Sequence, residues 1–231
     1  MSAVVHDIWT GVRERVLALR TAPHRQDVFG AEFGSFGHGF ELLPVLDEAQ
    51  VAEIERQLGV RLPDEYRTFL LRVGAGGAGP DYGVLPVGRL DDDAFRASRI
   101  FRPEATRELT EHEESEPVAH GYDDWPAEEQ ERFRQAYADW GRRWDELSDN
   151  LSDGTLCVSE QGCGYYTLLA LTGEARGTMW DDVRAVGHGV VPVRFTRSGD
   201  DPNSLVSYAD WYLRWLEHAE RTACGGRPPE P

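Results

Sequence analysis

The sequence predicts an α+β fold, in which helices pack on one side of a mostly antiparallel sheet. Two observations carry this prediction. Several segments repeat apolar residues at three- and four-residue steps, which is the periodicity of an amphipathic helix. The second half of the chain instead contains four short apolar stretches with Gly-containing turns between them, which is typical of a meander of antiparallel hairpins. One short strand and an inserted acidic helical segment precede the four-strand meander, and a helix follows it.

The first helix is expected at residues 4–20, where apolar side chains recur on one face. The members of this face are Val5, Ile8, Trp9, Val12, Val16 and Leu19. A stretch rich in Gly and Phe follows at residues 29–40. Its composition predicts an irregular loop that is held in place by its aromatic side chains.

Two further helices are expected in close succession. Asp47 can cap a helix at residues 48–58, and Gln50, three residues further on, completes a pattern close to a capping box. A helix at residues 63–73 begins with Pro63, which suits the first helical turn.

A Gly-rich run at residues 74–79 closes this third helix. The run formally fits the Gly-x-Gly-x-x-Gly fingerprint of dinucleotide-binding proteins, which needs a strand before the glycines and a helix after them. Here a helix precedes the run and Pro80 follows it, so a helix-ending turn is favoured. Residues 83–87 then predict a short strand with an internal Pro, which favours an edge position. Residues 89–99 predict a short helix.

The next segment is strongly acidic. Residues 104–153 hold 16 acidic and 5 basic residues, a balance of −11. Within them, Pro126 and the acidic residues after it mark the start of a helix at residues 126–148. Its apolar face consists of Phe133, Tyr137, Trp140, Trp144 and Leu147. The regular helical spacing predicts that this helix is docked on the body of the protein and that its aromatic stripe is core.

Four strands are expected after the acidic segment, each joined to the next by a turn that contains Gly. They occupy residues 155–160, 165–171, 177–186 and 190–196. A last helix is expected at residues 204–220, capped by Asn203 or Ser204.

The pattern predicts one main domain with additions. Residues 1–41 form an N-terminal helical extension, and residues 42–220 form a single domain that contains the acidic insertion at about 90–153. Residues 221–231 are expected to be a disordered tail because of their composition.

Composition excludes several classes of function. The 231 residues carry 41 acidic and 24 basic side chains, a formal net charge of −17, which argues against direct binding of nucleic acid or of an anionic membrane. All basic residues other than His are Arg, and without Lys there is no Walker-type phosphate loop and no Schiff-base chemistry. Three cysteines are too few for a disulfide scaffold. With no signal-like or membrane-spanning stretch, the expected location is the cytoplasm.

Three stretches resemble the SUKH superfamily, which also carries the name Smi/Knr-like. The first is Leu62-Pro63-Asp64-Glu65-Tyr66-Arg67-Thr68-Phe69-Leu70 with the Gly-rich run after it, and it is similar to the family's Leu-Pro-x-x-Tyr-x-x-Phe-Leu helix. The others are the meander leading to Trp180-Asp181 and the terminal Ser207-Tyr208-Ala209-Asp210-Trp211 helix. The similarity covers about residues 42–218, and the N-terminal extension and the acidic insertion depart from it.

The resemblance implies a non-catalytic protein-binding domain without a cofactor. Bacterial members of the superfamily are often immunity proteins that neutralise a secreted polymorphic toxin, and others are regulatory scaffolds. The first hypothesis is therefore a cytoplasmic immunity protein whose partner is a basic toxin domain of nuclease or deaminase type. The alternative is a regulatory or scaffold module that binds an endogenous protein.

A cysteine hydrolase built on Cys163 is a more distant alternative. The thiol lies in a predicted Gly turn, and His188, in another turn, is the nearest candidate base. The acidic surroundings disfavour a thiolate, so a turn cysteine without a catalytic task is the preferred interpretation.

No metal-ligand motif with recognised spacing occurs. His112 lies among glutamates, which is more typical of a solvated charge run than of a metal site. Asp91, Asp92 and Asp93 lack the alternating ligands and the central Gly of a calcium loop. No metal is therefore expected.

Two groups of residues are candidate partner contacts. Those of the acidic insertion are Glu111, Glu113, Glu114, Glu116, Asp123 and Asp124. Those of the sheet rim are Glu160, Gln161, Trp180, Asp181 and Asp182. An acidic surface can occupy the basic substrate channel of a nucleic-acid enzyme and accelerate association. The competing interpretation of the acidic insertion is a solvated face that keeps the protein soluble. The competing interpretation of Trp180 is a side chain buried in the core.

Overall fold

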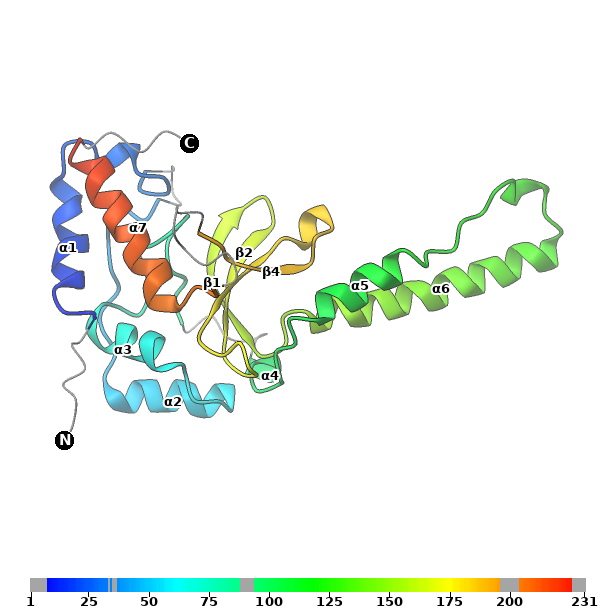
Figure 1. Ribbon diagram of the computed structural model, residues 1–231, viewed down its shortest axis with the longest axis horizontal. Helices are drawn as coiled ribbons and strands as arrows, with labels where there is room; N and C mark the ends of the chain where they lie inside the picture. The colour runs from blue at the N-terminus through cyan, green and yellow to red at the C-terminus, as the bar shows by residue number, and fades with distance from the viewer. Residues whose placement is uncertain (1–7, 33, 35–36, 88–93, 196–203, 226–231) are drawn as a thin grey trace.

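A four-stranded antiparallel sheet in the order β1-β2-β3-β4 forms the centre of the molecule (Figure 1). The computed structural model describes residues 8–32, 34, 37–87, 94–195 and 204–225. The strands are β1 (Thr155–Gly162), β2 (Tyr165–Ala170), β3 (Met179–Asp182) and β4 (Val190–Pro192). Each strand pairs with the next along the chain, so the predicted meander is confirmed.

The helices confirm the α+β class. They are α1 (Val12–Ala18), α2 (Glu48–Leu58), α3 (Asp64–Arg72), α4 (Ala94–Ala97), α5 (Ala105–Glu113), α6 (Ala127–Asn150) and α7 (Tyr208–Ala223). Helix α2 begins with the predicted capping box, in which Asp47 accepts a hydrogen bond from the Gln50 amide and the Gln50 side chain accepts one from the Asp47 amide.

The main core lies on one face of the sheet, under α1, α3 and α7 (Figure 1). Its centre is aromatic: the ring of Phe69 lies 4.7 Å from that of Tyr212 and 5.3 Å from those of Trp9 and Tyr208. Trp9 also donates from its indole nitrogen to the carbonyl of Glu65, at 3.0 Å. The N-terminal extension therefore contributes to the same core as the motif helix α3.

The opposite face of the sheet is covered by the base of the acidic insertion, whereas the sequence predicted helices on one side only. Side chains alternate along β2, so that Leu169 points into the main core and Leu168 into a second, smaller one. Leu147 and Leu151, at the end of α6, pack into this second core together with Trp180. The predicted helices on one side are present, and the insertion adds a layer on the other.

The short strand expected at residues 83–87 is reduced to isolated bridges at one residue, Val84. Val84 bridges Ser159 of β1 on one side and Gly77 on the other, and Gly77 in turn bridges Leu42. Because Val84 is paired on both sides, it does not form an edge, in contrast to the prediction. The Gly-rich run therefore pairs with neighbouring segments, and residues 80–87, which follow it, form no helix that could receive a phosphate.

Several element boundaries differ from the predicted ones. The strand expected at residues 177–186 ends at Asp182 and continues as a short 3-10 helix. The last helix begins later than expected, with Ser207 as its cap, and runs to Ala223, which is fully buried. Residues 221–223 are therefore helical and not part of a tail. The expected cap Asn203 and the tail beyond residue 225 lie outside the described residues.

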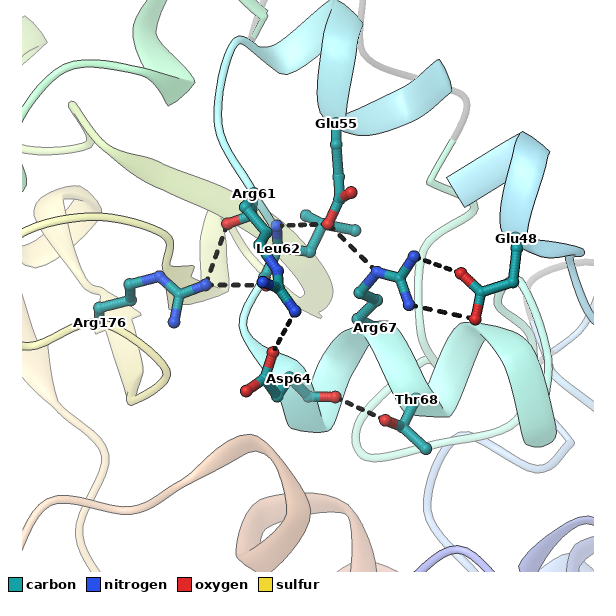
Figure 2. A network of polar contacts seen from close by, with 8 residues as sticks. All are labelled: Glu48, Glu55, Arg61, Leu62, Asp64, Arg67, Thr68 and Arg176. Atoms are coloured by element: carbon teal, nitrogen blue, oxygen red, sulfur yellow. Dashed lines mark hydrogen bonds and ion pairs between the residues drawn. The ribbon is translucent and has the colours of Figure 1, made fainter. Parts of the chain in front are cut away.

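A polar network holds the motif helix α3 against its neighbours (Figure 2). The guanidinium of Arg67 pairs with Glu48 and, at 3.4 Å, with Glu55, both on α2. Glu55 also accepts the amide of Leu62 at 3.0 Å. From the β2–β3 turn, Arg176 donates to the carbonyl of Leu62 at 2.8 Å. The connection between α2 and α3 is thus fixed from two sides.

We expect Glu55→Ala to lower the free energy of unfolding by roughly 1–2 kcal/mol, because it leaves the Leu62 amide unpaired and removes a charged partner of Arg67. Urea unfolding measures this loss. The matched control is Glu53→Ala in the same helix, since Glu53 is half exposed and pairs only with α2 side chains. Its unfolding midpoint should stay close to that of the wild type, and equal losses in both variants would contradict the role given to Glu55.

Candidate partner-binding surface

The acidic insertion forms an arm that extends away from the body of the protein (Figure 1). We define the arm as residues 105–150, which include α5, α6 and the connection between them. Helix α6 is 24 residues long, roughly 36 Å at 1.5 Å per residue. Only its last turns reach the second core under the sheet. The prediction that this helix is docked on the body is therefore correct at its base and wrong for the rest of its length.

The aromatic stripe of α6 reaches a core only at its base, where Trp144 packs against the second core; Phe133, Tyr137 and Trp140 lie outside it, in contrast to the prediction. Of its predicted members only Leu147 is buried, and Tyr137 is 44% exposed. The rings instead contact one another along the arm: Phe133 lies 5.7 Å from Trp125 and 6.1 Å from Tyr137, which lies 5.7 Å from Trp140. The arm is too thin to enclose them, because only α5 and an extended connection lie opposite α6. They remain half-exposed.

Four hydrogen bonds between three pairs of residues fix α5 and its connection to α6. His112 and Trp140 exchange two hydrogen bonds between side chains and main chain, at 2.9 and 3.0 Å, and their rings stack 5.3 Å apart. Glu113 accepts the indole N–H of Trp144 at 3.0 Å. Glu116 accepts the Tyr137 hydroxyl at 3.2 Å, which raises the pKa of that phenol. Two of the predicted contact residues, Glu113 and Glu116, thus also hold the arm together.

The negative charge of the arm is concentrated near its tip. Each arginine of α6 pairs with an acid one turn away: Arg132 with Glu128, Arg134 with Glu131, Arg142 with Asp139 and Arg143 with Glu146. Residues 108–131 contain ten acids and no arginine.

Most of the predicted contact acids are not neutralised. Glu111 pairs with Arg107 at 3.5 Å, and both side chains are exposed. Among the described residues, no arginine pairs with the other five, which are Glu113, Glu114, Glu116, Asp123 and Asp124. We call residues 111–140 the distal arm, a surface that combines these carboxylates with half-exposed aromatic rings.

The sheet-rim candidates do not form one surface. Trp180 is 5% exposed and packs edge-on against Phe101 at 5.0 Å, so it is not available as an anchor. Asp182 is equally buried and forms an ion pair with Arg184 at 2.5 Å. Both face the second core. Gln161 and Asp181 lie on the opposite face and contact each other at 2.6 Å, while Glu160 is exposed at the end of β1. Because successive side chains of a strand point to opposite faces, the five candidates are divided between the two faces of the sheet.

The arrangement around Cys163 gives no support to nucleophilic catalysis. The thiol is exposed in the β1–β2 turn, at a positive φ of 54°. His188 is exposed in the turn before β4, and within the described part of the chain no hydrogen bond joins the two side chains. Attack by a thiolate needs a base within hydrogen-bond reach.

Over the described ranges, no three His, Cys, Asp or Glu side chains converge as metal ligands. Asp91, Asp92 and Asp93 lie outside those ranges. None of the described helices has the length and the apolar character that a membrane crossing requires.

Sequence reasoning missed two residues at the tip of the arm. Tyr122 and Trp125 lie in the connection between α5 and α6, and each ring lies 5.7 Å from that of Phe133. Their position could have identified them, because both are aromatic residues in a long acidic segment that contains few apolar residues. Aromatic residues in such a segment have little to pack against except one another.

The fold and the arm together define an α+β domain with an inserted helical hairpin. A family model described as the SMI1 / KNR4 family (SUKH-1) matches residues 46–187, more than half of the chain. The chain belongs to this family, as the Leu-Pro-x-x-Tyr helix predicted. No curated protein and no solved structure matches the chain.

Proposed function

We propose that this chain is a non-catalytic immunity protein that binds a cognate toxin stoichiometrically and blocks its active site or substrate groove. The observation that carries the proposal is the distal arm, where half-exposed aromatic rings lie beside carboxylates that no arginine neutralises. Protein-protein interfaces use this combination: aromatic side chains provide buried anchors, and charges set the rate of association. Family membership is consistent with a binding role.

The charge of the distal arm favours a basic protein as partner, and we propose a toxin domain of nuclease or deaminase type. Such an enzyme needs a basic channel for its nucleic-acid substrate. The arm is long, narrow and acidic, so it fits a channel of this kind better than a flat surface. Nucleic acid itself is not proposed as a ligand, because both partners would be negatively charged.

Affinity capture from the source organism, with the full chain as bait, identifies the partner. The recovered protein is then produced in a host with and without this chain. The proposal expects the partner to arrest growth when it is alone and expects this chain to restore growth. A partner that is harmless when alone would contradict the immunity role and would instead support a regulatory module.

We expect reversal of three distal-arm charges, with Glu114, Asp123 and Asp124 each changed to Lys, to slow association with the partner by roughly 10- to 100-fold at low salt. These acids are exposed and make no ion pair in the described part of the chain, so the arm should stay folded. Stopped-flow measurement of the association rate at several salt concentrations tests this.

The matched control alters the net charge by the same amount but on the body of the protein, with Glu14, Glu174 and Glu217 each changed to Lys. All three are exposed and lie far from the arm in the sequence. Their reversal should change the rate by less than a factor of about 3. If both triple variants slow association equally, total charge and not the distal arm controls the encounter.

A further inference from the structure

A second site lies in the body of the protein, independent of the arm. It is a cleft of about 570 Å³ between the face of the sheet and α7. The turn before Val84 contributes Asp81, the sheet contributes Asp181, and α7 contributes Trp211 and Trp215. The candidate residues Gln161 and Asp181 thus belong to a hollow that sequence reasoning did not predict.

The turn that carries Asp81 is rigidly built. The buried Ser159 hydroxyl lies 3.1 Å from the carbonyl oxygen of Pro80 and 2.9 Å from that of Gly83. Asp81 itself has a left-handed backbone with φ of 56°. Gly30 packs directly against its carbonyl, so closely that a Cβ at Gly30 would lie 1.7 Å from the oxygen. The Asp81 carboxylate is therefore positioned by the fold and not by contacts of its own.

Asp81 and Asp181 differ in how their charges are compensated. Asp181 accepts a hydrogen bond from the Gln161 amide at 2.6 Å, and the same amide donates to Thr167 at 2.9 Å. Within the part of the chain that the structure describes, no hydrogen bond or ion pair reaches the Asp81 carboxylate. Burial and the nearby Asp181 raise the pKa of Asp81 to about 6. A half-buried carboxylate beside a second one is costly unless a cation joins them.

We propose that this cleft binds a guanidinium group, the end of an arginine side chain or of free arginine, between the carboxylates of Asp81 and Asp181. A guanidinium presents several N–H donors in one plane and can bond two carboxylates at once. Its flat face also stacks on aromatic rings. The cleft already contains one example, because the Arg214 guanidinium lies 4.2 Å from the centre of the Phe195 ring.

The other charged groups that line the cleft are basic. Arg214, His218 and Arg221 come from α7, and Arg194 comes from the segment that follows β4. Arg194 donates to the carbonyl of Ser204 at 3.1 Å, and neither it nor the others forms an ion pair with Asp81. Among the described residues, none of these cations is paired with Asp81 or Asp181, so the acidic pair is not neutralised within the cleft.

Isothermal titration calorimetry on the full chain tests the proposal with three ligands. N-acetyl-L-arginine amide represents a side chain within a polypeptide, L-arginine represents the free amino acid, and L-citrulline is the neutral isostere. At about pH 7.5 we expect at least one arginine compound to bind, and citrulline to bind at least roughly tenfold more weakly. Binding of L-arginine alone assigns the cleft to the free amino acid; binding of the amide assigns it to a polypeptide side chain.

The variants Asp81→Asn and Asp181→Asn should each weaken arginine binding at least roughly tenfold, since they remove charge with little change in shape. Asn also tolerates the left-handed backbone of position 81. Asp64→Asn, at an exposed carboxylate of α3 outside the cleft, is the control and should leave binding unchanged. Lowering the pH to about 5 protonates Asp81 and should weaken binding in the wild type but less in Asp81→Asn.

Three results would overturn the proposal: citrulline bound as well as arginine, Asn variants that bind like the wild type, or no arginine compound bound at about 10 mM. A urea unfolding curve for each variant establishes that it is folded, so that lost binding is not lost structure. None of these results depends on the partner of the arm, so the cleft and the arm are tested separately.

Discussion

Gly77→Ala is expected to lower the free energy of unfolding by at least about 3 kcal/mol. Gly77 has φ of 108°, in the region that side chains rarely adopt. A Cβ there would lie 2.3 Å from the carbonyl oxygen of Glu41. The backbone cannot move away, because Gly77 exchanges hydrogen bonds of 2.7 and 2.8 Å with Val84. Urea unfolding, or failure to obtain folded protein, measures the loss.

Gly141→Ala is the matched control for this substitution. Gly141 lies within α6 with no atom near the position of an added Cβ. An alanine in a helix interior is favoured over Gly by roughly 0.5–1 kcal/mol. The same chemical change should therefore stabilise the protein at one site and destabilise it at the other. A small effect at Gly77 would mean that the Leu42–Gly77–Val84 pairing is not needed for the fold.

Trp180→Ala should have the second-largest effect, a loss of about 3–5 kcal/mol. The side chain is nearly buried between the sheet and the base of the arm, and its indole N–H donates to Thr178 at 2.9 Å. Removing it leaves a cavity beside Phe101, Leu147 and Leu151. Chemical unfolding monitored by circular dichroism measures the loss.

The neighbouring variant Ile100→Ala is the control for Trp180, since Ile100 is 70% exposed and should change stability by less than about 0.5 kcal/mol. Partner binding provides a second test of the same residue. If Trp180→Ala leaves stability unchanged but abolishes binding, then Trp180 is an anchor and the second core is not as described.

Local signals were sufficient for much of the fold. The capping box at Asp47 and Gln50 involves residues three apart, and the Gly-containing turns lie next to the strands that they join. Such features depend on few long-range contacts, so the sequence pattern identifies them directly. The motif helix α3 was also predicted, because its apolar face has the regular helical period.

The arm shows where periodicity is insufficient. The spacing of Phe133, Tyr137 and Trp140 shows that one face of α6 is apolar, but not what covers that face. In the arm, only the short helix α5 and the connection between α5 and α6 lie against this face, so the rings stay half-exposed. Helix α5 was missed because the acidic residues obscure its short apolar pattern, which has only Ala105 and Leu109 buried.

The cleft depends on long-range contacts that no local pattern reports. Asp81 and Asp181 are 100 positions apart in the sequence, and the Ser159 hydroxyl and Gly30 fix the turn that carries Asp81 from two further segments. The different surroundings of Asp181 and Asp182 also result from tertiary contacts. One faces the cleft and the other is buried against Arg184, because the strand alternates between two covered faces.

The central claim is that the distal arm, residues 111–140, contacts the partner. Hydrogen exchange of the full chain, alone and in complex with the captured partner, tests it without any substitution. We predict slower exchange in the arm, most clearly in the connection at residues 114–126, and unchanged exchange in α2 and α3. Slower exchange on the body with no change in the arm would contradict the claim.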